Sequence, residues 1–260
     1  MYIFLIILLV AIAAYYLFRK KAPAAHASQQ TNYAALLEAN VTYYQKLDVT
    51  SKTLFEKRIA EFLDDTHIEG VGTEINDQDR VLIASSAVIP IFGFPGWRYQ
   101  NLTNVILYPD TFDGEFQFEG GNRNILGMVG SGYMNGQMLL SRAALTKGFS
   151  KSAGSENTAI HEFVHLLDKS DGATDGVPEN LMTHEYAAPW LHLMHVEMHK
   201  IEHNRSDINP YALTNEAEFF AVTTECFFDR PRELRGEHPA LYELLKEFYC
   251  QDPAGRLART

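Results

Sequence analysis

The chain has 260 residues, of which 46% are hydrophobic, 12% aromatic and 21% charged. This composition excludes a disordered chain, and with only 2 cysteines it also excludes a disulfide scaffold. The length fits one large globular domain or two small ones. A formal net charge of -11 argues against direct nucleic-acid binding, because phosphate recognition requires a basic surface.

The first 18 residues predict a transmembrane anchor. The segment from Met1 to Phe18 contains no charged residue, and as a helix it would be roughly 27 Å long, close to the thickness of a bilayer's hydrocarbon core. Arg19, Lys20 and Lys21 follow it directly, and such basic clusters stay on the cytoplasmic side. We therefore expect a single-pass protein of the inner (cytoplasmic) membrane whose globular part faces the cytoplasm. A cleaved secretory signal is the alternative, since small residues at 22–28 resemble a cleavage site, but the basic cluster lies on the wrong side of the apolar run.

A basic flank and linker at 19–32 separates this anchor from a domain that we expect to span 33–260. Apolar residues at helical spacing predict two helices between Tyr33 and Leu63, and a buried helix at 77–89 that Pro90 ends. A short apolar run at 104–108 predicts a strand. Helical spacing returns in the second half of the chain, at 155–168, 183–202, 215–228 and 239–249. The predicted fold class is therefore α+β, rich in helix, with a small sheet.

Glycines crowd between Gly120 and Gly136, and residues 137–141 follow as a second predicted strand. The glycine-rich segments are interpreted in the first place as surface connections. The alternative is that the strand at 137–141 borders a cleft and pairs with an extended peptide through its free edge. The residues by themselves leave both interpretations open.

The segment from His161 to His165 has the pattern H-E-x-x-H. Two histidines four residues apart project from the same face of a helix, so both imidazoles can bind one tetrahedral zinc ion at ~2.0 Å. Glu162 lies at the far edge of this face, where it can reach water at the metal without being a ligand. Ser155 is the predicted N-cap of the helix. A separate apolar stripe faces the core, and this context favours a metal-binding helix over two incidental histidines: Ile160, Phe163, Val164 and Leu167.

A catalytic zinc site needs a third protein ligand and an open position for water. Asp171 lies ten positions after His161, where metzincins place their third ligand, but the glycine that this layout requires is replaced by Asp168. The other source is the predicted helix at 215–228, and spacing alone does not choose among its three glutamates. They lie among apolar residues, where an unpaired carboxylate is costly: Glu216, Glu218 and Glu225. With Asn215 as N-cap, Glu218 could instead complete a capping box.

Two other polar features have competing interpretations. Asp168 either orients the imidazole of His165 or caps the end of its helix. Four histidines on the predicted helix at 183–202 follow spacings of three, four and four, and could be mistaken for a second metal site. An apolar stripe runs beside them, so they are interpreted as its solvated border: His192, His195, His199 and His203.

The sequence resembles the Mlc titration factor A family of zinc-dependent peptidases. The resemblance lies in HEFVHLLDKSDGATDGVP at 161–178, NPYALTNEAEFFAVTTECFFDRP at 209–231 and, more loosely, in 89–112, and it extends over about residues 35–250. It implies a zincin-like metallopeptidase domain related to gluzincins, which acts on peptide or protein substrates. It implies His161, His165 and Glu218 as ligands of Zn²⁺, Glu162 as general base and Tyr211 as an active-site hydroxyl. The family also implies a transcriptional repressor as partner, but its cytosolic members lack an amino-terminal span and no residue here matches that binding surface.

These observations predict a membrane-anchored zinc metallopeptidase. Glu162 would take a proton from water at the metal and pass it to the leaving amine, while Tyr211 would donate a hydrogen bond to the developing oxyanion. A membrane-tethered protein that sequesters a transcriptional regulator, with zinc in a structural role, is the alternative from a different class. The glutamate of the H-E-x-x-H motif favours the enzyme, because a structural zinc site needs no general base. A periplasmic peptidase would differ only in topology.

Overall fold

The structure is a computed structural model that describes residues 33–118, 123–130, 134–150, 156–182 and 184–255. The predicted anchor at 1–18 and the linker at 19–32 lie outside these residues. Within the described ranges, no helix combines the length and the apolar character that crossing a membrane requires. The anchor therefore stays a prediction from the sequence.

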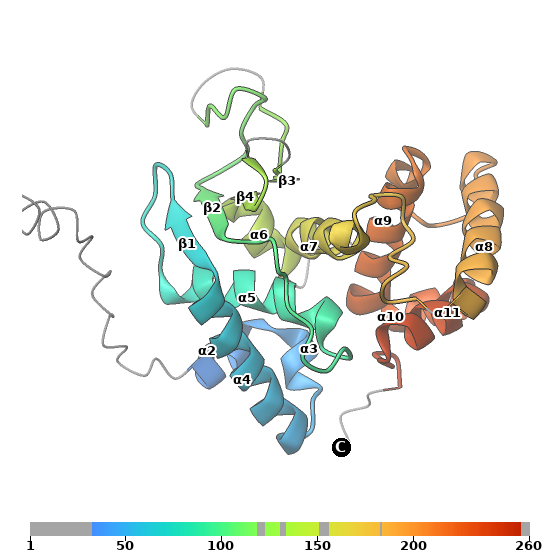
Figure 1. Ribbon diagram of the computed structural model, residues 1–260, viewed down its shortest axis with the longest axis horizontal. Coiled ribbons are helices and arrows are strands. Elements are labelled where there is room, and N and C mark those ends of the chain that lie inside the picture. Colours follow the sequence, from blue (N-terminus) through green and yellow to red (C-terminus); the bar gives the residue numbers. More distant parts are fainter. Residues whose placement is uncertain (1–32, 119–122, 131–133, 151–155, 183, 256–260) are drawn as a thin grey trace, which may run out of the picture. The chain divides into compact units, whose positions relative to one another are not determined.

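Helices dominate the described part of the chain, as the sequence predicts (Figure 1). Where the sequence predicts two helices between Tyr33 and Leu63, the structure has three, because the helical backbone is interrupted at Val41. They are α2 (Tyr33–Asn40), α3 (Thr42–Gln45) and α4 (Val49–Asp65). The other α-helices are α5 (Asp77–Ile91), α6 (Arg142–Gly148), α7 (Thr158–Asp168), α8 (His184–Glu202), α9 (Glu216–Asp229), α10 (Pro231–Glu237) and α11 (Pro239–Tyr249), with short 3₁₀ turns η2 (Lys169–Asp171) and η3 (Pro210–Leu213). Together with the sheet they form a helix-rich α+β fold, so this fold class is confirmed.

Four strands of the described residues form a mixed sheet in the order β1-β2-β4-β3. The strands β1 (His67–Gly70), β2 (Asn104–Tyr108) and β4 (Gln137–Ser141) are parallel, and β3 (Gly127–Val129) pairs antiparallel with β4. The predicted strands at 104–108 and 137–141 are confirmed. The interpretation of 137–141 as a strand with a free edge is wrong, because β4 pairs with β2 on one side and with β3 on the other. The strand at that end of the sheet is β3.

Helix α5 crosses the core, and almost all of its residues are buried. It begins at a capping box, in which Asn76 and Asp79 exchange side-chain to backbone hydrogen bonds. The prediction that Pro90 ends this helix is wrong, since the helix extends to Ile91 with Pro90 inside its last turn. A proline removes only its own N–H from the hydrogen-bond ladder, and so close to the end of a helix this loss is small.

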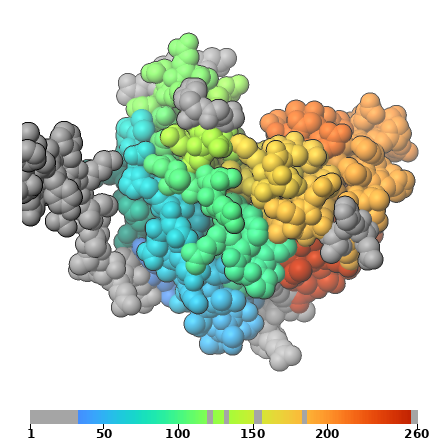
Figure 2. Space-filling view, viewed as in Figure 1, coloured from blue at the N-terminus to red at the C-terminus, as the bar shows by residue number. Residues whose placement is uncertain are grey.

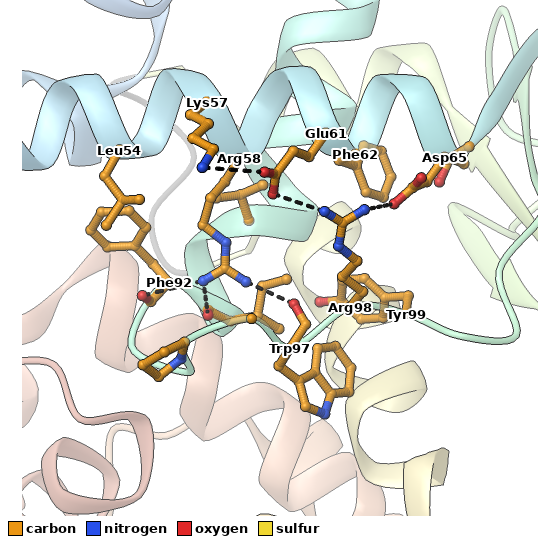
Figure 3. A pocket seen from close by; sticks show the side chains of 15 residues that line it. Leu54, Lys57, Arg58, Glu61, Phe62, Asp65, Phe92, Trp97, Arg98 and Tyr99 are labelled. Atoms are coloured by element: carbon orange, nitrogen blue, oxygen red, sulfur yellow. Dashed lines mark hydrogen bonds and ion pairs between the residues drawn. The ribbon is translucent and has the colours of Figure 1, made fainter.

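The side chain of Arg58, on α4, donates hydrogen bonds to carbonyl groups at the end of α5 and in the turn that follows it. Its guanidinium donates to the carbonyl of Ile91 at 2.8 Å, to that of Phe94 at 3.1 Å and to that of Trp97 at 2.8 Å (Figure 3). Burial of the guanidinium lowers the pKa of Arg58 from its ordinary value. A half-buried cation thus holds the turn that follows α5 against α4.

Helix α7 is the element from which the candidate site is built, and it packs against α5, α6, α9 and β3 (Figure 1). Its apolar stripe is buried as predicted: Ile160, Phe163, Val164 and Leu167 are each at most 1% exposed. The ring of Phe163 lies 5.7 Å from that of Phe62 on α4 and 5.2 Å from that of Tyr99. Aromatic packing on this side orients the opposite face of α7 away from the core.

Candidate metal centre

Helix α7 begins at Thr158, a few residues later than its sequence pattern predicts. The prediction of Ser155 as N-cap is wrong, because the helix starts at Thr158. Asn157 is the N-cap, and its side-chain oxygen accepts a hydrogen bond from the backbone N–H of Ile160 at 3.2 Å. Both residue types are good N-caps, so the local sequence allows either start. Asn157 is 1% exposed and also donates from its side-chain amide to the carbonyl of Gly148 at 3.2 Å, which ties the cap to α6.

Three ligand-type atoms converge on the half-buried face of α7 that carries its histidines. His161 Nε2 lies 2.9 Å from Glu218 Oε2 and 3.1 Å from His165 Nε2, and His165 Nε2 lies 3.5 Å from Glu218 Oε2. The side chains of these residues are 12%, 15% and 16% exposed. Two imidazole nitrogens come from one helix and one carboxylate oxygen from α9, 53 residues after His165 in the chain.

A second glutamate of α9 holds the other side of the His161 ring. Glu225 Oε1 lies 2.7 Å from His161 Nδ1, and Glu225 Oε2 accepts a hydrogen bond from the backbone N–H of Asn157 at 2.5 Å. A carboxylate on Nδ1 fixes the ring so that Nε2 points toward the other two donors. Glu225, an alternative third ligand in the sequence, lies in this supporting position.

The charges around His161 favour a cation. Burial lowers the pKa of His161, but hydrogen bonds with Glu218 and Glu225 outweigh it and raise the pKa to about 10. Burial raises the pKa of Glu218, but its hydrogen bonds with His161 and His165 lower it to about 2. The carboxylates of Glu218 and Glu225 therefore stabilise a positive charge at His161, and the two histidines in turn keep Glu218 ionised.

This donor set fits a divalent metal ion. Two imidazole nitrogens and one carboxylate oxygen are the protein ligands that catalytic zinc sites use, with a fourth position left for water. The atoms that would bind the ion already face one another within 4.8 Å. A second group of His and Glu side chains meets the same distance limit at the end of α8, but all three of its described members are exposed: His199, Glu202 and His203.

Glu162 lies beside this cluster without being part of it. Glu162 is 8% exposed, and burial raises the pKa of its carboxyl group. The strand β3 packs directly on it: a Cβ atom placed on Gly127 would lie 2.7 Å from Glu162 Cγ and 2.9 Å from Thr158 Cγ2. Only glycine leaves room for the Glu162 side chain between α7 and β3.

Tyr211, in η3, lies beside the histidines and lines the same cleft. Asn209 caps this turn by accepting a hydrogen bond from the backbone N–H of Tyr211 at 3.0 Å. The tyrosine ring is centred 6.0 Å from the ring of His161, and the residue is 53% exposed. Burial of its hydroxyl group raises the pKa of Tyr211, and the carboxylate of Glu218 raises it further.

These residues line a cleft of about 400 Å³ whose walls are β3, α7, η3 and the start of α9. Figure 2 shows the surface notched between the green region that contains β3 and β4 and the orange region that contains α8 and α9. Where β3 pairs with β4, the backbone N–H of Gly130 and the carbonyl of Leu126 form hydrogen bonds with β4. Backbone groups of successive residues in a strand point alternately toward and away from a neighbouring strand, so those of Gly127 and Val129 face away from β4. The cleft therefore has a strand with outward-facing backbone groups along one wall.

The other candidates from the sequence lie apart from the cluster. Asp171, in η2, accepts hydrogen bonds from the backbone N–H groups of Ala173 and Glu179 at 3.0 Å and 2.7 Å. The side chain of Glu216 is 47% exposed and lies 3.8 Å from His195. His192, His195, His199 and His203, in α8 and directly after it, are exposed, so their interpretation as the solvated border of an apolar stripe is confirmed.

Asp168 has a role that the sequence does not suggest. It is 1% exposed, and its Oδ2 accepts a hydrogen bond from the backbone N–H of Gly176 at 2.9 Å, which closes the loop after α7. Burial raises its pKa to about 6. Among the described residues, its Oδ1 has no hydrogen-bond partner and neither has His165 Nδ1. Within the described part of the chain, the Asp168 carboxylate forms no hydrogen bond with His165 and none with the backbone of α7, so neither predicted role is observed.

Comparisons with known proteins agree with this geometry. A model of the family described as glucose-regulated metallo-peptidase M90 matches residues 16–250. Mlc titration factor A of Escherichia coli O9:H4 is 32% identical over 202 residues, which are 73% of this chain and 74% of that protein. Mlc titration factor A of Serratia proteamaculans is 30% identical over 200 residues, 72% of this chain and 75% of that protein. A protein of Synechocystis sp. named only "Uncharacterized protein slr2042" is 29% identical over 236 residues, 85% of this chain and 84% of its own length.

Proposed function

The chain belongs to the glucose-regulated metallo-peptidase M90 family, and we propose that it is a zinc-dependent peptidase that hydrolyses peptide bonds in the cleft between β3 and α9. The observation that carries the proposal is the convergence of His161 Nε2, His165 Nε2 and Glu218 Oε2 beside a buried glutamate. The family is one of metallopeptidases, and two imidazole nitrogens with one carboxylate oxygen favour zinc as the metal.

His161, His165 and Glu218 would hold the ion, and when bound it would supply a Lewis acid that polarises the scissile carbonyl and acidifies water. The carboxylate of Glu162 accepts the proton of the attacking water and delivers it to the leaving amine. Its raised pKa suits both steps, because a carboxyl group that binds a proton more readily is a better base in the first step and still gives the proton to an amine in the second.

The hydroxyl group of Tyr211 donates a hydrogen bond to the oxygen that becomes negatively charged as water attacks. Its pKa is raised, so the hydroxyl group stays protonated and remains a donor at neutral pH. The tyrosine is 53% exposed and lines the cleft beside His161, with the two ring centroids 6.0 Å apart.

The peptide lies extended against β3. The outward-facing backbone groups of Gly127 and Val129 can exchange hydrogen bonds with it, as in other complexes where a peptide adds a strand to a sheet edge. Such bonds recognise any peptide backbone, and side-chain preferences then depend on the cleft walls.

Membrane location and partners are separate proposals that rest on the sequence. The uncharged segment at 1–18 and the basic residues at 19–21 support a single-pass anchor in the inner (cytoplasmic) membrane with a cytoplasmic domain. A reporter fused after residue 260 should be active only as a cytoplasmic reporter, and activity of a periplasm-dependent reporter would reverse this topology. The name of the relatives says that they titrate Mlc, and a repressor partner for this chain stays a prediction from that resemblance.

The peptidase is tested by the Glu162→Gln variant. We expect it to keep one zinc per chain, measured by elemental analysis, while kcat on a fluorogenic peptide falls by about 10²- to 10⁴-fold, the usual contribution of general acid and base catalysis. Glu202→Gln, an exposed glutamate on α8, is the matched control and should leave kcat unchanged. Equal turnover by the parent and the Glu162→Gln protein would exclude the mechanism.

The predicted zinc ligands are tested by measuring the zinc content of two further variants. Glu218→Ala should lose zinc, while Glu216→Ala, two residues away on the exposed side of α9, should retain it. Zinc that survives Glu218→Ala unaltered would move the third ligand elsewhere.

A further inference from the structure

Lys169 continues the ligand face of α7. It caps the carboxyl end of the helix and lies four residues after His165, as His165 lies four residues after His161, so the three side chains follow one another along one side of the helix. Each step of four residues advances about 6 Å along the axis. The ammonium group therefore belongs to the same cleft as the metal ligands, of whose lining it forms part.

Lys169 is the one lysine or arginine among the described residues that line this cleft, and its charge is not neutralised by a described carboxylate. Its Nζ donates to the side-chain oxygen of Asn135 at 3.4 Å, a long hydrogen bond to a neutral group. Of the two carboxylates that line the cleft, Glu218 is paired with His161 and His165, and Glu162 is a buried residue of α7. In the described structure no Asp or Glu oxygen lies within 4.0 Å of this ammonium group.

A second cavity, of about 300 Å³, opens on the other side of Lys169. Lys169 lines both cavities, so they adjoin at this side chain. No Asp or Glu occurs among the described residues that line the second cavity, although the chain as a whole has 33 of them. Its polar lining consists largely of amide side chains, namely Gln100, Asn101, Asn135 and Asn180.

The other cation of this cavity is already paired. Arg98 lies 2.5 Å from Asp65 and 3.3 Å from Glu61, both on α4 (Figure 3). Its positive charge is therefore offset by carboxylates of the protein itself. Lys169 remains as the group that can pair with a negative charge from outside, and the amides around it can donate further hydrogen bonds to that charge.

We propose that Lys169 and the adjoining amide-lined cavity form a subsite for a carboxylate group of the peptide substrate. Lys169 lies one helical turn, about 6 Å along α7, beyond the ligand His165, so the carboxylate that it pairs with would lie within a few residues of the scissile bond. This inference rests on the proposed peptidase function. It specifies the substrates of that peptidase as peptides that carry a negative charge near the cleavage site. The carboxylate comes either from an acidic side chain or from the free carboxyl end of the peptide.

A purely structural role for Lys169 is the competing explanation. A cation at the carboxyl end of a helix stabilises the helix dipole, and Lys169 occupies that position on α7. Such a role would change stability in the same way whichever peptide is present. A difference between charged and neutral peptides is therefore the property that separates the two explanations.

The experiment measures peptide binding to the full chain carrying Glu162→Gln and loaded with zinc. The probes are fluorescein-labelled alanine-based hexapeptides: one neutral with a carboxamide end, a set with a single Glu moved through the six positions, and one with a free carboxyl end. We expect at least one carboxylate peptide to bind about tenfold more tightly than the neutral one by fluorescence anisotropy. The Glu set and the free-end peptide distinguish the two sources of the carboxylate.

Adding Lys169→Met should abolish this preference, whereas Lys169→Arg should retain it because the charge remains. Lys57→Met is the matched control, since the Lys57 side chain is 71% exposed on α4, and it should leave the preference intact. Equal binding of charged and neutral peptides, binding of none of them, or a preference that survives Lys169→Met would overturn the proposal. Hydrolysis of the neutral peptide by the parent protein is scored separately, so that failure of the peptidase proposal is distinguished from failure of the subsite.

Discussion

At the scale of single residues, the site depends on two glutamates of one helix that do different work. Glu218 and Glu225 are seven residues apart on α9, which places them two turns apart on the same face. Glu218 approaches Nε2 of His161, and Glu225 approaches Nδ1 of the same ring. The imidazole is therefore held between two carboxylates, and only one of its nitrogens is directed at the metal position.

This arrangement predicts the effect of Glu225→Gln. The variant keeps the size of the side chain but removes the negative charge that orients His161, and we expect zinc affinity to fall by 10- to 100-fold, the usual cost of losing such a partner. Competition with a chromophoric chelator measures the affinity. Glu216→Gln serves as control, and an unchanged zinc affinity of the Glu225→Gln protein would show that the ring is positioned by other contacts.

At the scale of elements, the site exists because a short strand lies directly on a helix. The strand β3 contacts α7 at Gly127, where the absence of a side chain admits the carboxylate of Glu162. The same strand is the last of the sheet and lines the cleft. One three-residue element thus positions the general base that we propose and offers a backbone to the substrate.

The close contact predicts that Gly127→Ala impairs catalysis without removing metal. The new methyl group would lie 2.7 Å from Glu162 Cγ, so the glutamate must move, and a shift of about 1 Å in a catalytic group can cost about 10²-fold in rate. The kcat and the zinc content are measured together. Gly114→Ala, where a Cβ atom meets nothing within 4 Å, is the control, and full activity of the Gly127→Ala protein would contradict this account of β3.

At the scale of the whole molecule, a buried histidine joins the helices of the second half to the loop that precedes η3. His238 Nδ1 lies 2.9 Å from Glu197 on α8, and His238 Nε2 lies 2.7 Å from Asp207 in the loop between α8 and η3. Hydrogen bonding to Glu197 raises the pKa of His238 above its ordinary value of 6.5, against burial, and Asp207 adds to the increase. Lys200 also pairs with Glu197, at 2.7 Å. The loop held in this way leads to Tyr211.

Because the pKa of His238 is higher in the folded protein than in the unfolded chain, its contribution to stability is fully present below pH 6.5 and is lost as the pH rises through the folded value. We expect the free energy of unfolding of the parent to exceed that of His238→Gln most at pH 6, and the difference to shrink from pH 7 to pH 9. Urea unfolding at each pH provides the measurement, with His203→Gln, an exposed histidine directly after α8, as control. A difference independent of pH would show that His238 stabilises the fold by packing alone.

Much of the fold follows from local patterns in the sequence. Helices α5, α7, α9 and α11 and strands β2 and β4 have apolar repeats long enough to predict, and their predicted bounds differ from the observed ones by a few residues. The strands β1 and β3 have four and three residues, too few to show alternation, and they form because β2 and β4 offer them partners. The position of β4 inside the sheet could not be predicted either, because the order of strands depends on how distant segments pack.

For the site, the sequence by itself determined that His161 and His165 share one face of a helix opposite an apolar stripe, because both depend only on the geometry of a single helix. Tertiary structure decided which carboxylates meet them: α9 packs on α7 so that Glu218 and Glu225 reach His161 while Glu216 faces outward. It also decided that Lys169 adjoins a cavity without a described carboxylate. Contacts of this kind join residues far apart in the chain, and only the packing of the whole core brings them within range of one another.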